Sequence, residues 1–267
     1  GTSVTRAGDG WKVWVIERGK SVFGRYLRYF LTVKKLARGS DVVFIQGAIS
    51  EGIPATLAAL CVGRPTVMRI PGDYAWEVYQ RKVGEGKGEL LDEFVKKSHG
   101  WPICLLEKLE RWTTKRAARV ITPSKYLKGI VEAWGVPAEQ ISVVHNSFEI
   151  VSAKKTREEL RKEFACENKQ VILSVARAVP WKGIDFLLEV LRTLSDDRLF
   201  VVLGDGPMLD AWKAQVKEMG IDSRVRFYGR QPREVVFDWM KAADVFVLAS
   251  SYEGFPHVVA EAMSTGI

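Results

Sequence analysis

The stretch Val245-Phe-Val-Leu-Ala249-Ser-Ser-Tyr-Glu253-Gly-Phe-Pro256-His-Val-Val-Ala-Glu261 decides the fold of the second half of the chain. Its apolar run predicts a strand, and Pro256 favours the first position of a helix because its fixed φ is already helical. Backbone amides at this helix start, that of His257 among them, would face the loop with the positive end of the helix dipole behind them. Glu253 and Glu261 are thereby predicted at the mouth of one cleft. Spacing alone leaves another interpretation open, in which Glu253 is a solvated loop residue and Glu261 only complements the helix dipole.

The residues upstream repeat this order of strand, loop and helix. Strands are predicted at 171–175, 199–203, 225–228 and 245–248, with helices at 184–194, 208–219 and 233–241 between them. Strict alternation of apolar strands with helices of about ten residues is typical of a parallel sheet covered on both faces. We therefore expect a doubly wound α/β domain in this half.

The first half shows the same alternation less regularly. Strands are predicted at 11–16, 41–46, 65–70, 119–122 and 141–144, and helices at 21–38, 54–61, 105–118 and 125–134, the last capped by Ser124. The polar, glycine-spaced residues 76–101 predict a mobile surface segment. A charged stretch at 152–169 separates the halves, so we expect domains at 1–150 and 151–267.

Composition restricts the class of protein. The chain has 267 residues, of which 47% are hydrophobic, so one or two domains with a real core are expected. The three cysteines are far apart and odd in number, which favours a reducing compartment without a disulfide framework or structural zinc. The longest apolar run, 53–62, is too short to span a membrane. We therefore expect a cytoplasmic protein, with peripheral contact to the inner face of the membrane as one possibility.

The net charge of +8 predicts an anionic partner, such as a phosphate-bearing substrate, nucleic acid or an acidic membrane. Dispersed basic residues on solvated faces are the alternative interpretation. Residues 21–38 form a basic amphipathic helix, with apolar residues such as Val22, Tyr26 and Phe30 on one face and Arg25 and Arg28 between them. Such a helix can lie on an anionic bilayer, or it can pack its apolar face on its own sheet.

The loops at the strand ends carry the candidate chemistry, because ligands of open α/β sheets bind there. Arg177 and Lys182 flank the start of the helix at 184–194. A forked donor, a point charge and free helix amides together suit a diphosphate, although ordinary surface charge would produce the same pattern. The turn Gly204-Asp-Gly-Pro207 lacks the third glycine of a dinucleotide fingerprint, so it is better explained as a turn that allows close backbone approach.

No metal or cofactor is expected. The chain has no Asp-x-Asp triplet, and its three histidines show no metal-ligand spacing. His257 could contact a ligand, whereas His99 and His145 are expected to be structural. Phosphate charge would then be met by Arg177 and Lys182.

Several motifs in order resemble one family. The segment from Glu253 to Glu261 is similar to the Glu-x7-Glu motif of the retaining glycosyltransferases of family 4, which have the GT-B fold. The loop at 177–183, the turn at 204–207, Val144-His-Asn146 and Ile121-Thr-Pro-Ser-Lys-Tyr126 follow in that family's order, and Pro71-Gly-Asp-Tyr-Ala-Trp-Glu77 resembles one of its subgroups.

The resemblance implies a role for each matching residue. Arg177 and Lys182 would hold the diphosphate of the donor and neutralise the leaving group. Glu261 would bind the ribose hydroxyls, and Glu253 would hold the sugar hydroxyls and stabilise charge at the reacting carbon. The remaining donor-binding residues would be Gly254, Phe255, Pro256, Asp205, Gly206, Arg230, Gln231 and Asn146, with Arg230 and Gln231 bordering the base. Asp73 stands where many members have a histidine and is the candidate for that donor contact.

The resemblance also implies an activity and an architecture. The expected protein is a retaining, metal-independent transferase that moves a hexose from a nucleotide sugar to a glycan, lipid or small-molecule acceptor. Its two Rossmann-like domains would face a cleft, with donor on the second and acceptor on the first. The family's first strand and glycine-rich loop are missing before Trp11, and the chain stops at Ile267, before the last elements of the second domain. We therefore expect an internal fragment with both domains incomplete, which folds poorly or is inactive alone.

Three other functions remain to be weighed. A nucleotide-sugar epimerase of similar fold would release free sugar or epimerised donor without an acceptor product. A basic nucleic-acid-binding protein would bind oligonucleotides with steep salt dependence, but two carboxylates in the cleft argue against nucleic acid as a partner. An NAD-dependent dehydrogenase is disfavoured by the incomplete glycine fingerprint.

Overall fold

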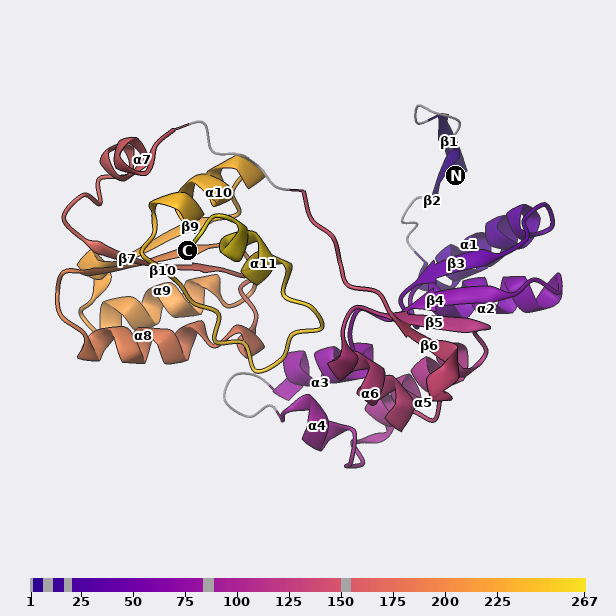
Figure 1. Cartoon of the computed structure of the whole chain (residues 1–267). Helices are drawn as coiled ribbons and strands as arrows, with labels where there is room; N and C mark the ends of the chain where they lie inside the picture. Colours follow the sequence, from indigo (N-terminus) through magenta and orange to yellow (C-terminus); the bar gives the residue numbers. More distant parts are fainter. Residues whose placement is uncertain (1, 7–11, 17–20, 84–88, 150–154) are drawn as a thin grey trace. The chain divides into compact units, whose positions relative to one another are not determined.

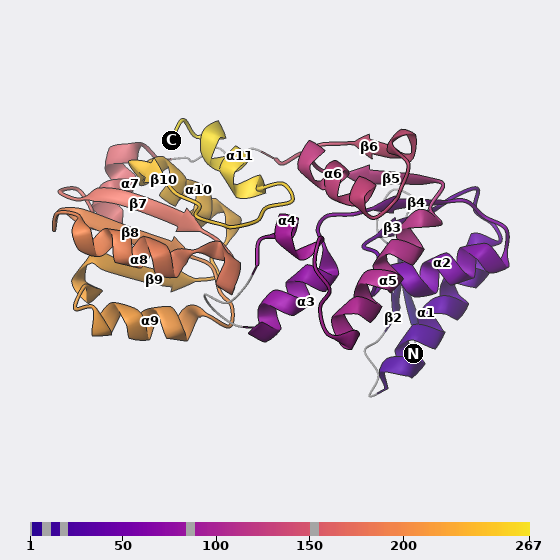
Figure 2. The ribbon, with the colours of Figure 1, turned by 90° about the horizontal axis from the view of Figure 1, so that it is seen from below.

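The computed structural model describes residues 2–6, 12–16, 21–83, 89–149 and 155–267. The chain forms two compact units (Figure 1, Figure 2). Unit 1 comprises Gly1–Glu77 and Val95–His145, and unit 2 comprises Val78–Phe94 and Asn146–Ile267. Each unit contains a parallel sheet with helices packed on it, so the predicted α/β class is confirmed.

Unit 1 is built on a parallel sheet with the strand order β3-β4-β5-β6. The strands are β3 (Val43–Gln46), β4 (Thr66–Arg69), β5 (Arg119–Thr122) and β6 (Ile141–Val143). The helices are α1 (Val22–Ala37), α2 (Gly52–Cys61), the start of α3 (Tyr74–Val83), α5 (Trp101–Lys115) and α6 (Lys125–Ala133), with a 3-10 turn, η1 (Ala138–Gln140). Helix α2 packs on β3 and β4, and α6 packs on β5 and β6.

A separate antiparallel hairpin precedes this sheet. It joins β1 (Thr2–Arg6) to β2 (Lys12–Ile16), with Val4 opposite Trp14. The strand predicted at 11–16 is therefore present, but it lies outside the parallel sheet; Trp11 itself is outside the described residues.

Two serine caps begin helices in unit 1 as their sequence context indicates. Ser124 Oγ accepts a hydrogen bond from Leu127 N at 3.2 Å, which confirms the predicted cap of α6. Ser21 Oγ accepts one from Gly24 N at 3.2 Å and starts α1 in the same way. Each cap satisfies a backbone amide that has no partner inside its helix.

The prediction of a mobile segment at 76–101 is wrong over most of its described residues. Helix α3 continues to Val83, and α4 (Leu91–Phe94) follows. Trp76 and Phe94 are fully buried, and the Tyr79 ring lies 5.3 Å from that of Phe94. Isolated aromatic residues bury enough surface to fix a helix even among many polar neighbours. Gly84, Gly86 and Gly88 of the segment lie outside the described residues.

Unit 2 is built on a second parallel sheet with the strand order β10-β7-β8-β9. The strands are β7 (Gln170–Val175), β8 (Arg198–Leu203), β9 (Val225–Gly229) and β10 (Val245–Phe246). The helices are α4, α7 (Arg157–Glu163), α8 (Ile184–Thr193), α9 (Leu209–Glu218), α10 (Arg233–Ala242) and α11 (His257–Ser264), with 3-10 turns η2 (Pro180–Lys182) and η3 (Asp222–Arg224).

Strand β8 divides the core of unit 2 into two layers. Leu199, Val201 and Leu203 face α10 and α11, whereas Phe200 and Val202 face α8 and α9. Figure 1 shows α10 on one side of the sheet and α8 and α9 on the other. Successive side chains of a strand point to opposite faces, so a continuous apolar run is what a sheet covered on both sides requires.

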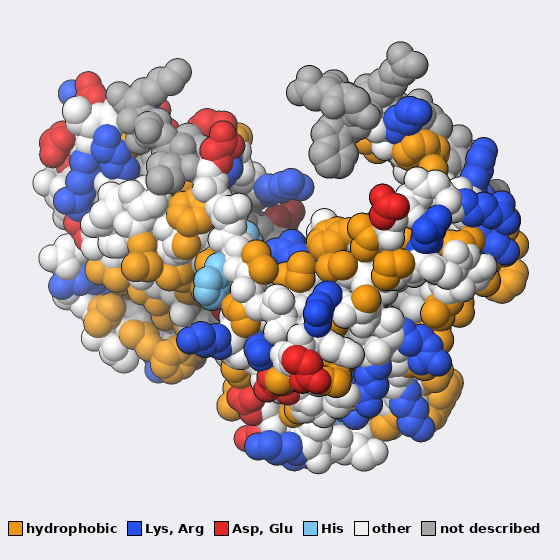
Figure 3. All heavy atoms as spheres, turned by 45° about the vertical axis from the view of Figure 1, so that its right-hand side comes forward, with side chains coloured by type: hydrophobic (Ala, Val, Ile, Leu, Met, Phe, Trp, Pro, Cys, Tyr) orange, Lys and Arg blue, Asp and Glu red, His pale blue; other side chains and the backbone are white. Residues whose placement is uncertain are grey.

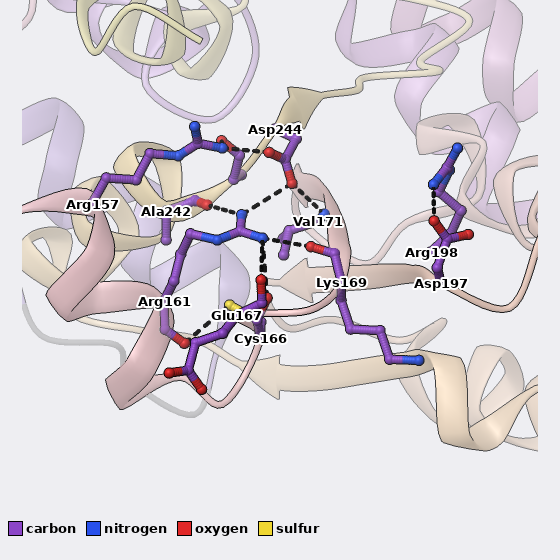
Figure 4. Close-up of polar contacts among 11 residues, drawn as sticks. Arg157, Arg161, Cys166, Glu167, Lys169, Val171, Asp197, Arg198, Ala242 and Asp244 are labelled. Carbon is purple, nitrogen blue, oxygen red and sulfur yellow. Dashed lines mark hydrogen bonds and ion pairs between the residues drawn. The ribbon is translucent and has the colours of Figure 1, made fainter.

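A polar cluster around Asp244 ties α7 to the sheet of unit 2 (Figure 4). The Asp244 carboxylate accepts from Val171 N at 2.7 Å and from Arg161 Nη1 at 3.0 Å, and it is also paired with Arg157. Arg161 further donates to the carbonyls of Ala242, at 2.9 Å, and Cys166, at 3.1 Å. The guanidinium of Arg161 thus joins three parts of unit 2 by hydrogen bonds: the loop after α7, the end of α10 and the residue before β10.

The charge of Asp244 is stabilised by these contacts. Burial alone would raise the pKa of Asp244, but the hydrogen bonds from Val171 N and Arg161 outweigh it, and the pKa lies below the ordinary value of 3.8. The charged stretch predicted to separate the two halves is therefore partly a structural element of unit 2.

We expect Arg161→Met to lower the free energy of unfolding of unit 2 by roughly 2–4 kcal/mol, because several carbonyls and Asp244 lose a largely buried donor. Arg157→Met is the matched control: its side chain is 44% exposed, so its loss should cost less than about 1 kcal/mol. Hydrogen exchange of the β7 and β8 amides measures both changes in unit 2 alone. Equal losses from the two substitutions would contradict the central role of Arg161.

Candidate nucleotide-sugar site

An open pocket of about 1220 Å³ lies at the carboxyl edge of the sheet in unit 2. Its walls are the loops that follow β7, β8 and β9 and the residues at the start of α11. The pocket gathers most residues that the sequence predicted for the donor, namely Arg177, Lys182, Asp205, Gly206, Arg230, Gln231, Glu253, Phe255, Pro256 and Glu261. Residues from four separate parts of the chain therefore meet where a parallel sheet presents its ligand site.

Glycines allow the loops to touch backbone to backbone beneath this pocket. A Cβ on Gly204 would lie 1.9 Å from the carbonyl oxygen of Ala176, and a Cβ on Gly206 would lie 2.4 Å from that of Ala178. Gly204 also has φ +133°, in the region that favours glycine. The close approach lets Ala178 N donate to Asp205 O at 2.9 Å, and on the other side Gly204 N donates to Gly229 O at the end of β9 at 2.7 Å. The expectation that this turn serves close backbone approach is confirmed.

Lys182 and Glu253 form an ion pair inside the pocket. Lys182 ends the 3-10 turn after β7, and Glu253 comes from the loop before α11. Their side chains are 15% and 24% exposed, so the pair is largely removed from water. In addition, Ser251 N donates to Trp181 O at 3.0 Å, which joins the two loops through their backbones. A cation for phosphate and a carboxylate for hydroxyls are thus direct neighbours.

Glu261 is paired with Arg233, the first residue of α10. Arg233 Nη2 donates to Glu261 Oε1 at 3.1 Å, and the Glu261 side chain is 17% exposed. Each carboxylate of the motif is therefore paired with one cation, which comes from the turn after β7 in one case and from the start of α10 in the other. The sequence did not predict a role for Arg233, because its partner lies 28 residues away. The one signal in the sequence was that Arg233 directly follows a loop at the end of a strand.

The helix start differs from its prediction. Pro256, with ψ +86°, is the N-cap residue, and α11 begins at His257. His257 N donates to Phe255 O at 3.0 Å, so this amide is not free to face a ligand as we had expected. The His257 ring instead contacts Asn146, whose Nδ2 lies 2.5 Å from Nε2. Asn146 thereby borders the pocket through His257, which lines it.

Arg177 and Arg230, which also line the pocket, differ from Lys182 and Arg233 in their contacts. Among the residues that the structure describes, neither Arg177 nor Arg230 makes an ion pair. Gln231 Nε2 donates to Tyr228 O at 2.6 Å, which turns the loop after β9. Asp205 Oδ1 accepts from Gly206 N at 2.7 Å, so the Gly206 amide is engaged within its own turn.

Asp73 lies in unit 1 and has a structural partner. Its side chain is buried, and Oδ1 accepts from Trp76 N at 2.8 Å, capping α3. Glu110, also buried, accepts from Tyr74 N at 3.1 Å and from Ala75 N at 3.3 Å. Burial raises the pKa of Asp73 to about 6, and burial together with the Asp73 charge raises that of Glu110. The donor contact assigned to Asp73 stays a prediction, as does a role for Gly254, which is not among the lining residues.

The described part of the chain holds neither a cluster of metal ligands nor a helix that could span a membrane. None of its groups of His, Cys, Asp and Glu could hold a metal ion. None of its helices is long and apolar enough to cross a membrane.

Comparison with protein families decides the class. Residues 4–147 match the family described as glycosyl transferase 4-like domain, and residues 156–267 match glycosyl transferases group 1. The chain belongs to these glycosyltransferases. The resemblance drawn from the Glu253 to Glu261 segment is confirmed.

Among curated relatives, a glycosyltransferase of Methanocaldococcus jannaschii is 25% identical over 235 residues, which cover 85% of this chain and 56% of the relative. The lipopolysaccharide 1,6-galactosyltransferase of Salmonella typhimurium is 32% identical over 164 residues, covering 57% of this glycosyltransferase chain and 44% of the relative. The chain thus spans about half the length of these relatives.

Solved structures show the same fold. Anabaena HepE in complex with UDP-glucose matches with a TM-score of 0.73 at 21% identity, over 89% of this chain and 61% of that one. Sucrose-phosphate synthase from Thermosynechococcus elongatus matches with a TM-score of 0.75 at 15% identity, over 98% and 66%. The architecture is therefore that of GT-B glycosyltransferases.

The backbone contact beneath the site can be tested directly. Gly204→Ala should lower the free energy of unfolding of unit 2 by roughly 3 kcal/mol or more, because its Cβ would collide with the Ala176 backbone. Gly220→Ala is the control, since Gly220 also has a positive φ, of +67°, but no atom within 4 Å of the added Cβ. It should cost about 1–2 kcal/mol. Urea titration of both variants measures the difference, and equal costs would show that the loops do not depend on this contact.

Proposed function

We propose that the chain carries the donor site of a retaining glycosyltransferase that moves a hexose from a nucleoside diphosphate sugar to a glycan or lipid-linked acceptor. The observation that carries this proposal is the direct pairing of Lys182 with Glu253 in the pocket. In a nucleotide sugar the reacting carbon is joined to a phosphate oxygen, so the groups that hold phosphate and sugar must be neighbours. This pair has that arrangement.

The donor we propose is a UDP-hexose. The Anabaena protein of the same fold binds UDP-glucose, and the Salmonella relative transfers galactose. The pocket volume of about 1220 Å³ leaves room for a ligand of this size. Glu261 would bind the ribose hydroxyls, and Arg230 and Gln231 would border the base.

Charge stabilisation on the leaving diphosphate would come from Arg177 and Lys182. Cleavage of the bond to the sugar leaves negative charge on the phosphate oxygens, which fixed cations stabilise most strongly in a site that excludes water. These two side chains would supply the positive charge, and we propose that no metal ion or cofactor is needed. Turnover should accordingly persist in the presence of a chelator.

Glu253 would position the sugar rather than attack it. A carboxylate that is ion-paired with an ammonium group is a weak nucleophile, because the pair stabilises its charge. It can still accept hydrogen bonds from sugar hydroxyls through its remaining lone pairs. We therefore propose attack by the acceptor on the face from which the diphosphate leaves, which retains the anomeric configuration.

Alanine substitutions separate these roles. Arg177→Ala or Lys182→Ala should weaken UDP binding by about 10-fold to 100-fold, because a charge-assisted contact is worth about 1.5–3 kcal/mol. Glu253→Ala should lower kcat more than it weakens UDP binding, and Lys213→Ala, exposed in the same unit, should change neither. Calorimetry with UDP and mass spectrometry of products from a panel of nucleotide sugars measure these effects. Wild-type kinetics in all site variants would refute the assignment, and free or epimerised sugar without an acceptor product would favour an epimerase.

We also propose that α1 contacts an anionic lipid surface, as suits a lipid-linked acceptor. Its residues Phe23, Leu27 and Leu31, spaced by four, are 78%, 46% and 53% exposed and form one stripe that continues to exposed Lys35. On the part of unit 1 that Figure 3 shows, basic and hydrophobic side chains lie side by side. Both features favour the interface of an acidic bilayer, to which apolar contact and positive charge each contribute. The enzyme would then act at the cytoplasmic face of the membrane.

Vesicle sedimentation tests this contact. Replacing Phe23, Leu27 and Leu31 together with Ser should abolish binding to vesicles that contain phosphatidylserine, and binding by the wild type should weaken with added salt. Replacing Phe186 and Val190 of α8 with Ser is the matched control, because they are 63% and 37% exposed with the same spacing. Equal binding by both variants, or no binding by the wild type, would exclude α1 as the lipid-contacting surface.

A further inference from the structure

Arg233 joins the pocket to the segment that precedes α7. Its Nη2 donates to Glu261 Oε1 at 3.1 Å and also to the backbone carbonyl of Glu149, and its Nη1 lies 3.8 Å from Glu149 Oε2. The Glu149 side chain is 89% exposed, whereas that of Glu261 is 17% exposed. The contact with Glu261 is therefore the stronger of the two ion pairs, since water screens the other.

The position of Arg233 does not help its own helix. It is the first residue of α10, where the helix dipole is positive and disfavours a cation. Its Cζ lies 5.5 Å from the centroid of the Phe237 ring, one turn along, so the side chain also packs along the helix. A cation in this place is better explained by its partner Glu261 than by helix stability.

A carboxylate that binds two neighbouring hydroxyls needs a fixed orientation and free lone pairs. Arg233 takes one lone pair of Oε1 and leaves the second, together with both on Oε2. It fixes the rotation of the carboxylate, so that the remaining lone pairs keep one direction. Lys182 fixes the Glu253 carboxylate in the same way, so each of the two carboxylates is oriented by one cation.

We propose that Arg233 is a positioning residue that orients Glu261 for the ribose hydroxyls of the donor and so makes the site selective for a ribonucleotide. This inference rests on the proposed function, because it concerns the same pocket. Arg233 would act through Glu261, without touching the phosphates or the base. Its removal should therefore affect only the part of the affinity that the ribose hydroxyls supply.

A pair of ligands isolates that part. UDP and 2′,3′-dideoxy-UDP differ only in the two hydroxyls, and calorimetry gives the affinity of each for the wild type, Arg233→Ala, Glu261→Ala and the double variant. We expect Arg233→Ala to lower the affinity for UDP about 10-fold and to leave the affinity for dideoxy-UDP unchanged. The double variant should bind UDP no more weakly than Glu261→Ala, because one residue acts through the other.

Two further variants guard against a general loss of structure. Arg233→Lys keeps the charge but not the fork, so it should retain part of the preference for UDP. Arg192→Ala, 61% exposed in the same unit, should leave both affinities unchanged. Thermal melting of each variant shows whether unit 2 is still folded.

The outcomes are distinguishable. An equal loss for both ligands in Arg233→Ala and Arg233→Lys, or additive losses in the double variant, would overturn the role of Arg233 while the proposed function stands. If the wild type binds neither UDP nor dideoxy-UDP, the proposed UDP donor fails, and the inference fails with it. Selective loss in Arg233→Ala with partial recovery in Arg233→Lys would establish it.

Discussion

Backbone contact between the loops after β7 and β8 is the constraint on which the pocket depends. Gly204 and Gly206 lie against the carbonyls of Ala176 and Ala178, closer than any other residue could. The same contact brings the loop carrying Arg177 and Lys182 beside the turn of Asp205. Hydrogen bonds across it, such as Ala178 N to Asp205 O, replace those that the strands no longer provide at their ends. The loops that carry these charged side chains are therefore joined to each other by backbone contacts.

Charge in this pocket is balanced locally. Lys182 of the turn after β7 is paired with Glu253, and Arg233 at the start of α10 is paired with Glu261 of α11. Such pairs reduce the mutual repulsion of the like charges that an anionic ligand site must collect, and they leave each carboxylate with lone pairs to offer. Arg177 and Arg230 then provide the excess positive charge. This local balance, rather than the net charge of +8, is what suits a ligand with both phosphate and hydroxyl groups.

The sequence was most informative where one local rule decided the structure. Apolar strands alternating with helices predicted both parallel sheets, and Ser124 marked the start of α6, because these features depend on neighbouring residues. Arg233 was missed because its partner Glu261 is distant in the chain, and no periodicity encodes a contact between the starts of two helices. Helix α3 was missed for another reason: beside Trp76 its buried positions are taken by Ala75 and the polar Gln80, so no apolar period marks it.

The carboxyl pair of unit 1, Asp73 and Glu110, is more deeply buried than the pair of unit 2, Glu253 and Glu261. Asp73 and Glu110 in unit 1 are buried beside each other, and burial raises the pKa of both, so each is easier to protonate than an exposed carboxyl. Their oxygens accept from backbone amides at the start of α3, which orders that helix. Glu253 and Glu261 in unit 2 instead meet fixed cations in an open pocket. Perturbed pKa values often indicate active sites. Here the more direct sign of a ligand site is a cation paired with each carboxylate at the edge of a parallel sheet. A carboxylate that only caps a helix needs no such cation.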